Sequence, residues 1–275
     1  MAGDEEAPIQ EHIIELLERL RRILIALIIT SGIVVIIPAQ LIEGKWNGYT
    51  PLVFYLMKRM QEDLTNVNNP IVKPIASFFG VKKLNVQLIA HSWLDSIEVI
   101  LQLSLLLGLV IAAPYIAKQI YEYLEPALEE REKRVLIPFS LLFFFLFTIG
   151  VLYAYYVILP LTFFFLSWLY LLGGVELIFS VKEFYSFAII GMLTTGLSFT
   201  FPLVVALLSY LDIISPDTLK KNWRYVVFII MVVTAIITPD PTPVSMTALA
   251  LPFLVLYVLS YLLAKKVHGR SGRPE

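Results

Sequence analysis

The sequence predicts an all-α integral membrane protein with six transmembrane helices, both termini in the cytoplasm, and short fifth and sixth spans. Of its 275 residues, 58% are apolar and only 16% are charged, whereas soluble domains average about 45–50% and about 25%. The mean hydropathy is +0.79, and long uncharged runs alternate with charged loops. A soluble domain needs more polar surface than this, so we expect the chain in a cell membrane, either a plasma or an inner membrane.

The same composition argues against several functions. A net charge of −1 disfavours nucleic acid as a partner. The chain has no cysteine, and its three histidines all fall outside the uncharged runs, so we expect no metal, no cofactor and no catalytic residue. The sequence therefore predicts a protein that is not an enzyme.

Six uncharged runs are candidates for membrane spans. Crossing about 30 Å of hydrocarbon takes about 20 helical residues, and five runs reach or approach that length: residues 23–42, 99–117, 135–175, 184–211 and 241–264. The remaining run, residues 225–239, has 15 residues and would form a helix of only about 22 Å. We therefore expect the fifth span to be too short for an ordinary bilayer.

The third run is too long for one span. Its 41 residues would extend about 60 Å as a helix, so we expect Pro160 to break it. Residues 161–175 would then form an interfacial cap, with a turn at Gly173 and Gly174. The rival interpretation makes this segment a seventh span and inverts everything downstream.

The distribution of basic residues favours six spans. Under this model, 14 of the 21 Lys and Arg lie on the side of the N-terminal tail, and six of the other seven lie in the long first outer loop, as the positive-inside rule requires. We expect one membrane domain over residues 1–275. It comprises a cytoplasmic amphipathic segment (1–22), an outer loop (43–96), a cytoplasmic loop (118–134) and a cytoplasmic tail (265–275).

The cytoplasmic N-terminal tail and the second loop carry 11 of the 22 acidic residues. In the tail, apolar residues recur at helical spacing while the glutamates follow another face, which predicts an amphipathic helix leading into the first span. Glu15 and Glu18 either pair with Arg19 and Arg22, at about 0.3–0.5 kcal/mol per pair, or Glu15 accepts a better ligand.

The second loop supports two interpretations as well. Pro126 is expected to end one helix, and the charged residues 129–134 to begin the next. This charged run is either a solvated helix start whose charges compensate one another, or a surface that recognises a cationic peptide. Carboxylates suit the second role because each can bind an arginine guanidinium through two hydrogen bonds.

Four segments together carry a family resemblance. They are residues 12–20 (HIIELLERL), residues 113–134 with Ala113-Pro114, Gln119 and YLEPALEEREKR, residues 215–225 (SPDTLKKNWRY), and residues 238–241 (TPDP) followed by Ser245. Their order and the six spans resemble the TatC family, the polytopic component of the twin-arginine protein translocase.

The resemblance implies a function. TatC proteins bind the signal peptides of folded proteins that carry consecutive arginines, and they assemble with single-span TatA-type or TatB-type partners in a pathway driven by the proton-motive force. Glu15 and Glu132 match the family carboxylates implicated in recognising the arginines, and Arg19, Tyr123 and Pro126 match their neighbours. The implied partners are these peptides, the single-span proteins and the lipid bilayer, and self-association is left open.

The chain departs from the family pattern in the fourth span, where Thr200 stands in place of a usual glutamate before Pro202. A threonine can bond back to its own helix or across to another. Asp240 lies among prolines, either as an ordinary turn residue or in an outer loop that the short fifth span holds low in the bilayer. Thr200, Pro202 and Asp240 are the candidate residues for docking a partner.

An ion-coupled secondary transporter is the alternative function. Such a protein usually carries ionisable residues near the midplane of the bilayer. No Asp, Glu, Lys, Arg or His lies in the middle of any predicted span. Prolines interrupt several spans, but without ionisable groups they would have little to couple.

Overall fold

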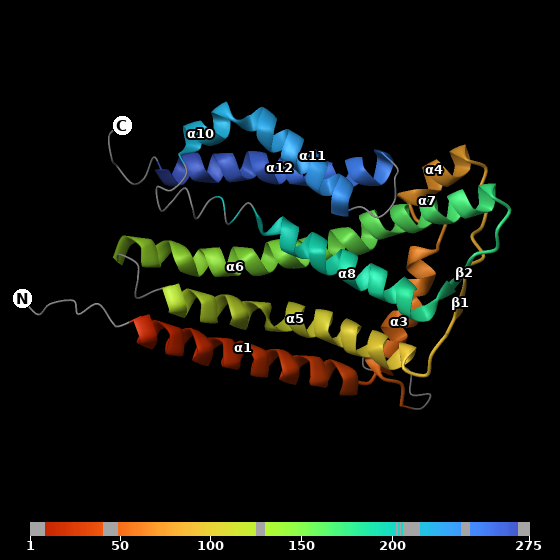
Figure 1. Ribbon diagram of the computed structural model, residues 1–275, viewed down its shortest axis with the longest axis horizontal. Coiled ribbons are helices and arrows are strands. Elements are labelled where there is room, and N and C mark those ends of the chain that lie inside the picture. The colour runs from red at the N-terminus through yellow and green to blue at the C-terminus, as the bar shows by residue number, and fades with distance from the viewer. Residues whose placement is uncertain are drawn as a thin grey trace, which may run out of the picture. The chain divides into compact units, whose positions relative to one another are not determined.

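The computed structural model describes residues 9–40, 49–124, 130–201, 203, 205, 215–237 and 243–268, and these are mostly helical (Figure 1). The chain divides into two compact units. The first comprises Met1–Val53 and Ile100–Phe145, and the second comprises Phe54–Val99 and Leu146–Glu275. Each unit is described by itself.

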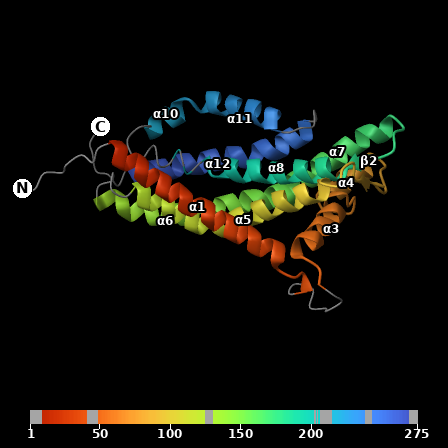
Figure 2. The ribbon, with the colours of Figure 1, turned by 60° about the horizontal axis from the view of Figure 1, so that its bottom comes forward.

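The first unit is built on α1 (Ile9–Ile36) and most of α5 (Asp95–Leu124), which lie side by side (Figures 1 and 2). The amphipathic segment and the first span form one continuous helix of 28 residues, about 42 Å long. Thr30 donates a hydrogen bond to the Gly108 carbonyl at 3.0 Å, and a Cβ on Gly108 would collide with Ser31. A glycine here lets the two helices approach closely.

The second unit contains the outer loop and the later helices. The predicted loop folds into α3 (Leu52–Leu64), α4 (Val72–Phe78) and β1 (Gln87–Ile89), and β1 pairs in parallel with β2 (Ile178–Ser180). The further helices are α8 (Val181–Phe199), α10 (Pro216–Lys221), α11 (Trp223–Ile237) and α12 (Pro243–His268).

Pro160 does not break the third run, so the predicted break is wrong. The helix α6 (Glu130–Tyr153) passes through a π-helical turn (Ala154–Ile158) directly into α7 (Leu159–Leu172). Proline lacks an N–H and crowds the carbonyl four residues earlier, and a π turn just before it lets the helix continue past this defect. The helices α5 and α12 likewise run through Pro114 and Pro252.

The first half of α7 belongs to the core of the second unit and is not a surface cap. Phe164 is only 1% exposed, and it packs in one cluster with Val72 and Ala76 of α4 and with Leu84 and Leu177. The predicted turn after the helix is confirmed, because α7 ends at Leu172 and Gly174 adopts a φ of +68°, which favours glycine.

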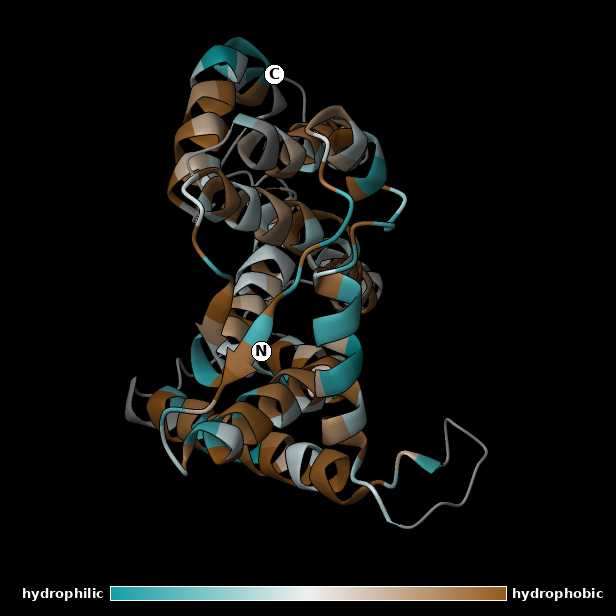
Figure 3. Cartoon of the chain, turned by 90° about the vertical axis from the view of Figure 1, so that its right-hand side faces the viewer, coloured by the Kyte–Doolittle hydropathy of each residue, from teal (hydrophilic) through white to brown (hydrophobic). Residues whose placement is uncertain are grey.

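Helix lengths and surfaces fit a membrane protein. Asp95–Tyr123 and Leu141–Leu172 are long and apolar enough to cross a bilayer, and Trp223–Ile236 and Met246–Leu262 are shorter apolar helices. The helices are built largely of hydrophobic residues (Figure 3), and side chains such as Phe228 and Ile236 are exposed. The helix α11, which corresponds to the predicted fifth span, has 15 residues, so its predicted short length is confirmed. The helix α12, which corresponds to the predicted sixth span, has 26 residues and is short only in its apolar part.

Candidate functional site

Arg19 lies between two carboxylates at one end of the α1 and α5 pair. Its Nε and Nη2 atoms donate to Oε1 of Glu15 at 3.0 and 2.7 Å, and its Nη1 donates to Oε2 of Glu122 at 2.9 Å. The Arg19 side chain is 16% exposed, and those of Glu15 and Glu122 are 33% and 30% exposed. We call these three residues the Arg19 cluster.

Helix geometry places the members of the Arg19 cluster. Glu15 precedes Arg19 by four residues and therefore shares its face of α1. Glu122 lies in the last turn of α5, where the Gln119 amide donates to it at 3.3 Å and the Lys118 ammonium lies 3.6 Å away. Gln119 is only 4% exposed, so this amide donor is held in place by the packing around it.

The cluster keeps Arg19 charged. Burial by itself would lower the pKa of Arg19, but the hydrogen bonds and negative charges of Glu15 and Glu122 outweigh it and hold the pKa above its ordinary value. Both bonds from Arg19 to Glu15 fall on Oε1. Within the described contacts, Oε2 of Glu15 is therefore left for another donor.

The structure describes the side chains of some predicted peptide-site residues and not of others. Pairing within α1 is present, because Glu15 bonds Arg19 and the exposed pair Glu18 and Arg22 lies at 3.9 Å. Tyr123 follows Glu122 in α5 and is partly buried. Glu132 lies in the first turn of α6, but its side chain, and Pro126 entirely, fall outside the described part of the chain.

Glu122 is the member of this cluster whose role the sequence did not indicate. The second span was expected to end at residue 117, which placed Glu122 in a loop. Instead α5 continues to Leu124 and α6 begins at Glu130, so the predicted loop 118–134 is largely helical. Extending the helix to the proline would have placed Glu122 at the same end as Arg19, since consecutive spans run in opposite directions.

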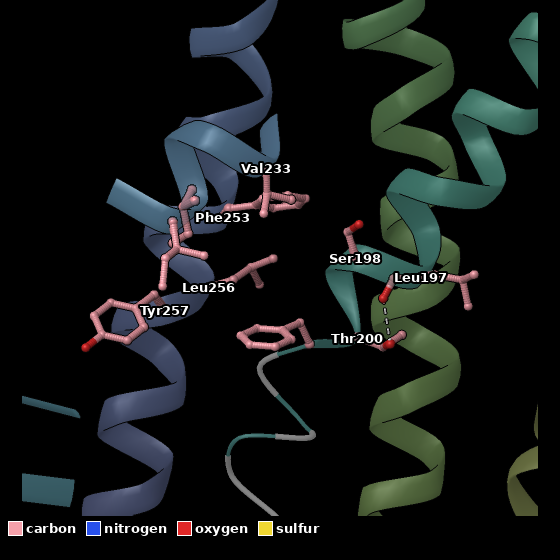
Figure 4. Close-up of a pocket in the computed structure, with 10 residues that line it drawn as sticks. Leu197, Ser198, Thr200, Val233, Phe253, Leu256 and Tyr257 are labelled. Carbon is pink, nitrogen blue, oxygen red and sulfur yellow. Dashed lines mark hydrogen bonds between the residues drawn. The ribbon is translucent and has the colours of Figure 1, made fainter. Parts of the chain in front are cut away.

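Thr200 lies at the C-terminal end of α8, beside an apolar pocket of about 420 Å³ (Figure 4). Its hydroxyl donates to the Leu197 carbonyl of its own helix at 2.7 Å. The pocket is lined by residues of α8, α11 and α12, and no carboxylate, lysine, arginine or histidine is among its lining residues in the described structure. Pro202 and Asp240 lie outside the described residues.

The described residues show no metal centre. Among them, no group of three or more His, Cys, Asp or Glu side chains is placed to hold a metal ion. The chemistry that the Arg19 cluster can perform is binding of a cation by carboxylates.

Comparison with known proteins gives a consistent family. The model of the family described as Sec-independent protein translocase protein (TatC) matches residues 11–252. The Aquifex aeolicus protein named TatC is 32% identical over 262 residues, which cover 94% of this chain and 95% of that protein. The Synechocystis TatC is 33% identical over 187 residues, covering 68% and 73%.

A solved structure agrees with the sequence matches. The crystal structure titled twin arginine translocase receptor TatC superposes with a TM-score of 0.64 at 30% identity, covering 93% of this chain and 99% of that one. At this identity and coverage, the likeness extends over nearly the whole fold.

Replacing Arg19 should destabilise the protein. The change Arg19→Gln leaves two half-buried carboxylates without their shared cation, and we expect a loss of about 1–3 kcal/mol, seen as a lower melting temperature of the purified protein in detergent. Arg22→Gln removes an exposed pair and should have an effect below about 0.5 kcal/mol. Removing the second carboxylate, in Arg19→Gln with Glu122→Gln, should recover part of the loss. Equal melting of the two single variants would contradict a structural role for the Arg19 cluster.

Proposed function

The chain belongs to the TatC family of Sec-independent protein translocase proteins, and from this premise we propose that it binds the signal peptides of folded proteins that carry consecutive arginines. As a family member it is a membrane protein of protein transport. The family and the general function predicted from the sequence are thereby confirmed. The proposal also includes the kind of peptide bound, the orientation of the chain in the membrane and its assembly with partners.

The observation that carries the proposal is the Arg19 cluster. Here the chain already binds one guanidinium between two carboxylates, and Glu15 retains an oxygen and a third of its surface. A peptide arginine has the same chemical group and can bind Oε2 of Glu15 beside Arg19. Charge-assisted hydrogen bonds of this kind contribute about 1.5–3 kcal/mol each, and lysine cannot reproduce the planar paired geometry.

The second peptide arginine is assigned to Glu132. This residue lies in the first turn of α6, the helix that follows α5 after residues 125–129. Two arginines in succession need two carboxylates, and the motif that includes Glu132 supplies the second. Tyr123 and Pro126 adjoin this motif and are proposed to shape the peptide's path.

The proposed orientation has six spans with both termini in the cytoplasm. Six helical elements supply the spans: α1, α5, α6 with α7, α8, α11 and α12. The excess of Lys and Arg on one side supports this orientation through the positive-inside rule. Glu15 and Glu132 then face the cytoplasm, where a signal peptide arrives before transport.

Assembly with TatA-type or TatB-type partners is proposed to use the pocket beside Thr200. Its lining is apolar, and Phe201 and Ile229 on its rim are exposed, so an apolar partner helix can pack there. Thr200 donates its hydroxyl proton to Leu197 and keeps acceptor capacity for a partner's hydroxyl or amide. Pro202 and Asp240 are proposed to belong to the same docking region.

Peptide binding tests the carboxylate assignment. A twin-arginine signal peptide carrying a photoreactive group should crosslink to the wild-type protein, and its Lys-Lys version should not. Glu15→Gln and Glu132→Gln should each weaken peptide binding by about tenfold or more, as the loss of one charge-assisted pair implies.

The matched control is Glu18→Gln, on the same helix three residues from Glu15. Glu18 is 66% exposed and its pair with Arg22 spans 3.9 Å, so its loss should leave peptide affinity unchanged. Equal affinity of the Arg-Arg and Lys-Lys peptides, or equal losses in the Glu15 and Glu18 variants, would refute the assignment.

Partner assembly is tested by filling the pocket. Ile229→Trp places a large side chain on its rim and should reduce co-purification of a TatA-type or TatB-type partner several-fold, while peptide binding persists. Phe228→Trp changes the neighbouring exposed residue, which does not line the pocket, and should have no effect. If Ile229→Trp leaves the recovery of the partner unchanged, the pocket is not the docking surface.

A further inference from the structure

The α1 and α5 helices also enclose a groove that the peptide site does not use. Its volume is about 430 Å³, and its body is apolar, with Ile25, Ile29 and Ile111 among its lining residues. These three side chains are 45%, 55% and 55% exposed. The groove is therefore open along its side to whatever surrounds the helices.

Both ends of this groove are closed by contacts between the helices. At one end, Arg19 bonds Glu122 across the two helices. At the other, Thr30 bonds the Gly108 carbonyl, and Ser31 lies too close to Gly108 for any side chain there. The lining residues of α1 run from Arg22 to Thr30, a rise of about 12 Å.

Two exposed basic side chains, Arg22 and Lys118, lie at or near the end of the groove next to the Arg19 cluster, and each pairs with one carboxylate. Arg22 lines the groove with Tyr115, is 55% exposed, and pairs with Glu18 at 3.9 Å. Because α1 and α5 are antiparallel and Arg19 meets Glu122, Lys118 lies level with Arg22 on the other helix. The Lys118 side chain is 66% exposed. Lys118 pairs with Glu122 at 3.6 Å, and it shares this carboxylate with Arg19.

We propose that this groove binds an anionic phospholipid, with the phosphate at Arg22 and Lys118 and an acyl chain along Ile25, Ile29 and Ile111. Two basic side chains at the end of an open apolar channel match the two parts of such a lipid. Basic pockets between transmembrane helices at the cytoplasmic face bind anionic headgroups.

The inference rests on the proposed membrane orientation and not on peptide binding. In that orientation Arg22 lies where the first span leaves the cytoplasmic leaflet, at the depth of the headgroups. The lipid would bind Arg22 and Lys118, whereas the peptide would bind Glu15 and Glu132. Lipid binding and peptide binding can therefore fail independently of each other.

Native mass spectrometry of the purified full chain in detergent tests the proposal. With matched acyl chains, phosphatidylglycerol should bind about fivefold more tightly than phosphatidylcholine for each cation engaged. Arg22→Gln should lower the affinity for phosphatidylglycerol by about fivefold and leave that for phosphatidylcholine unchanged. Ala26→Phe, which fills the groove, should weaken binding of both lipids.

The matched control is Arg59→Gln in the second unit. Arg59 is 60% exposed and pairs with Asp63 at 3.5 Å, four residues along its helix, much as Arg22 pairs with Glu18, so its loss should not alter either affinity. Three results would overturn the proposal: equal affinities for the two lipids, equal effects of the Arg22 and Arg59 variants, or full competition by inorganic phosphate alone. A fourth result would also overturn the proposal. If a twin-arginine peptide displaces the lipid, and the Arg22→Gln variant binds that peptide more weakly than the wild type does, the groove binds cargo.

Discussion

The charge of Arg19 must be neutralised where it lies between two largely apolar helices, α1 and α5, and much of the first unit depends on how this is done. Glu15 from the same helix and Glu122 from α5 share the guanidinium. The contact joins residues 103 positions apart in sequence and fixes the antiparallel register of the two helices at this end. The close approach of Gly108 to Ser31 fixes it further along. Peptide recognition is proposed to extend this arrangement with a guanidinium from outside.

The second unit combines ion pairs, such as that between Lys182 and Glu98 at 2.8 Å, with close helix packing. A Cβ on Gly150 would lie 2.8 Å from the Gly196 Cα, and one on Gly196 would lie 2.8 Å from a methyl of Val151, so paired glycines bring α6 and α8 together. The π turn before Pro160 lets α6 continue into α7. The first half of α7 then packs in one hydrophobic cluster with residues of the predicted outer loop. The pocket beside Thr200 borders α8, and it is proposed to receive a partner's helix.

Composition and apolar runs were enough to predict the helical membrane class and the short α11, because a helix in lipid requires a long run of apolar residues. Local rules failed where a tertiary feature compensates for a defect, as at Pro160, where a π turn absorbs the missing donor. They failed at Glu122 for another reason. Its role depends on a partner 103 residues away, and a helix boundary misplaced by seven residues put it in a loop. Glu132, Pro126, Pro202 and Asp240 remain predictions, since the described structure does not include their side chains.

The central claim is that a carboxylate already bound to the chain's own arginine also binds an arginine of the cargo. The most direct measurement is a solid-state NMR distance between ¹⁵N-labelled guanidinium groups of a bound twin-arginine peptide and ¹³C-labelled glutamate carboxyl groups of this chain. We predict contacts within about 4 Å to Glu15 and to Glu132, of which the first disappears in Glu15→Gln and the second remains. An unchanged set of contacts in Glu15→Gln would contradict the claim.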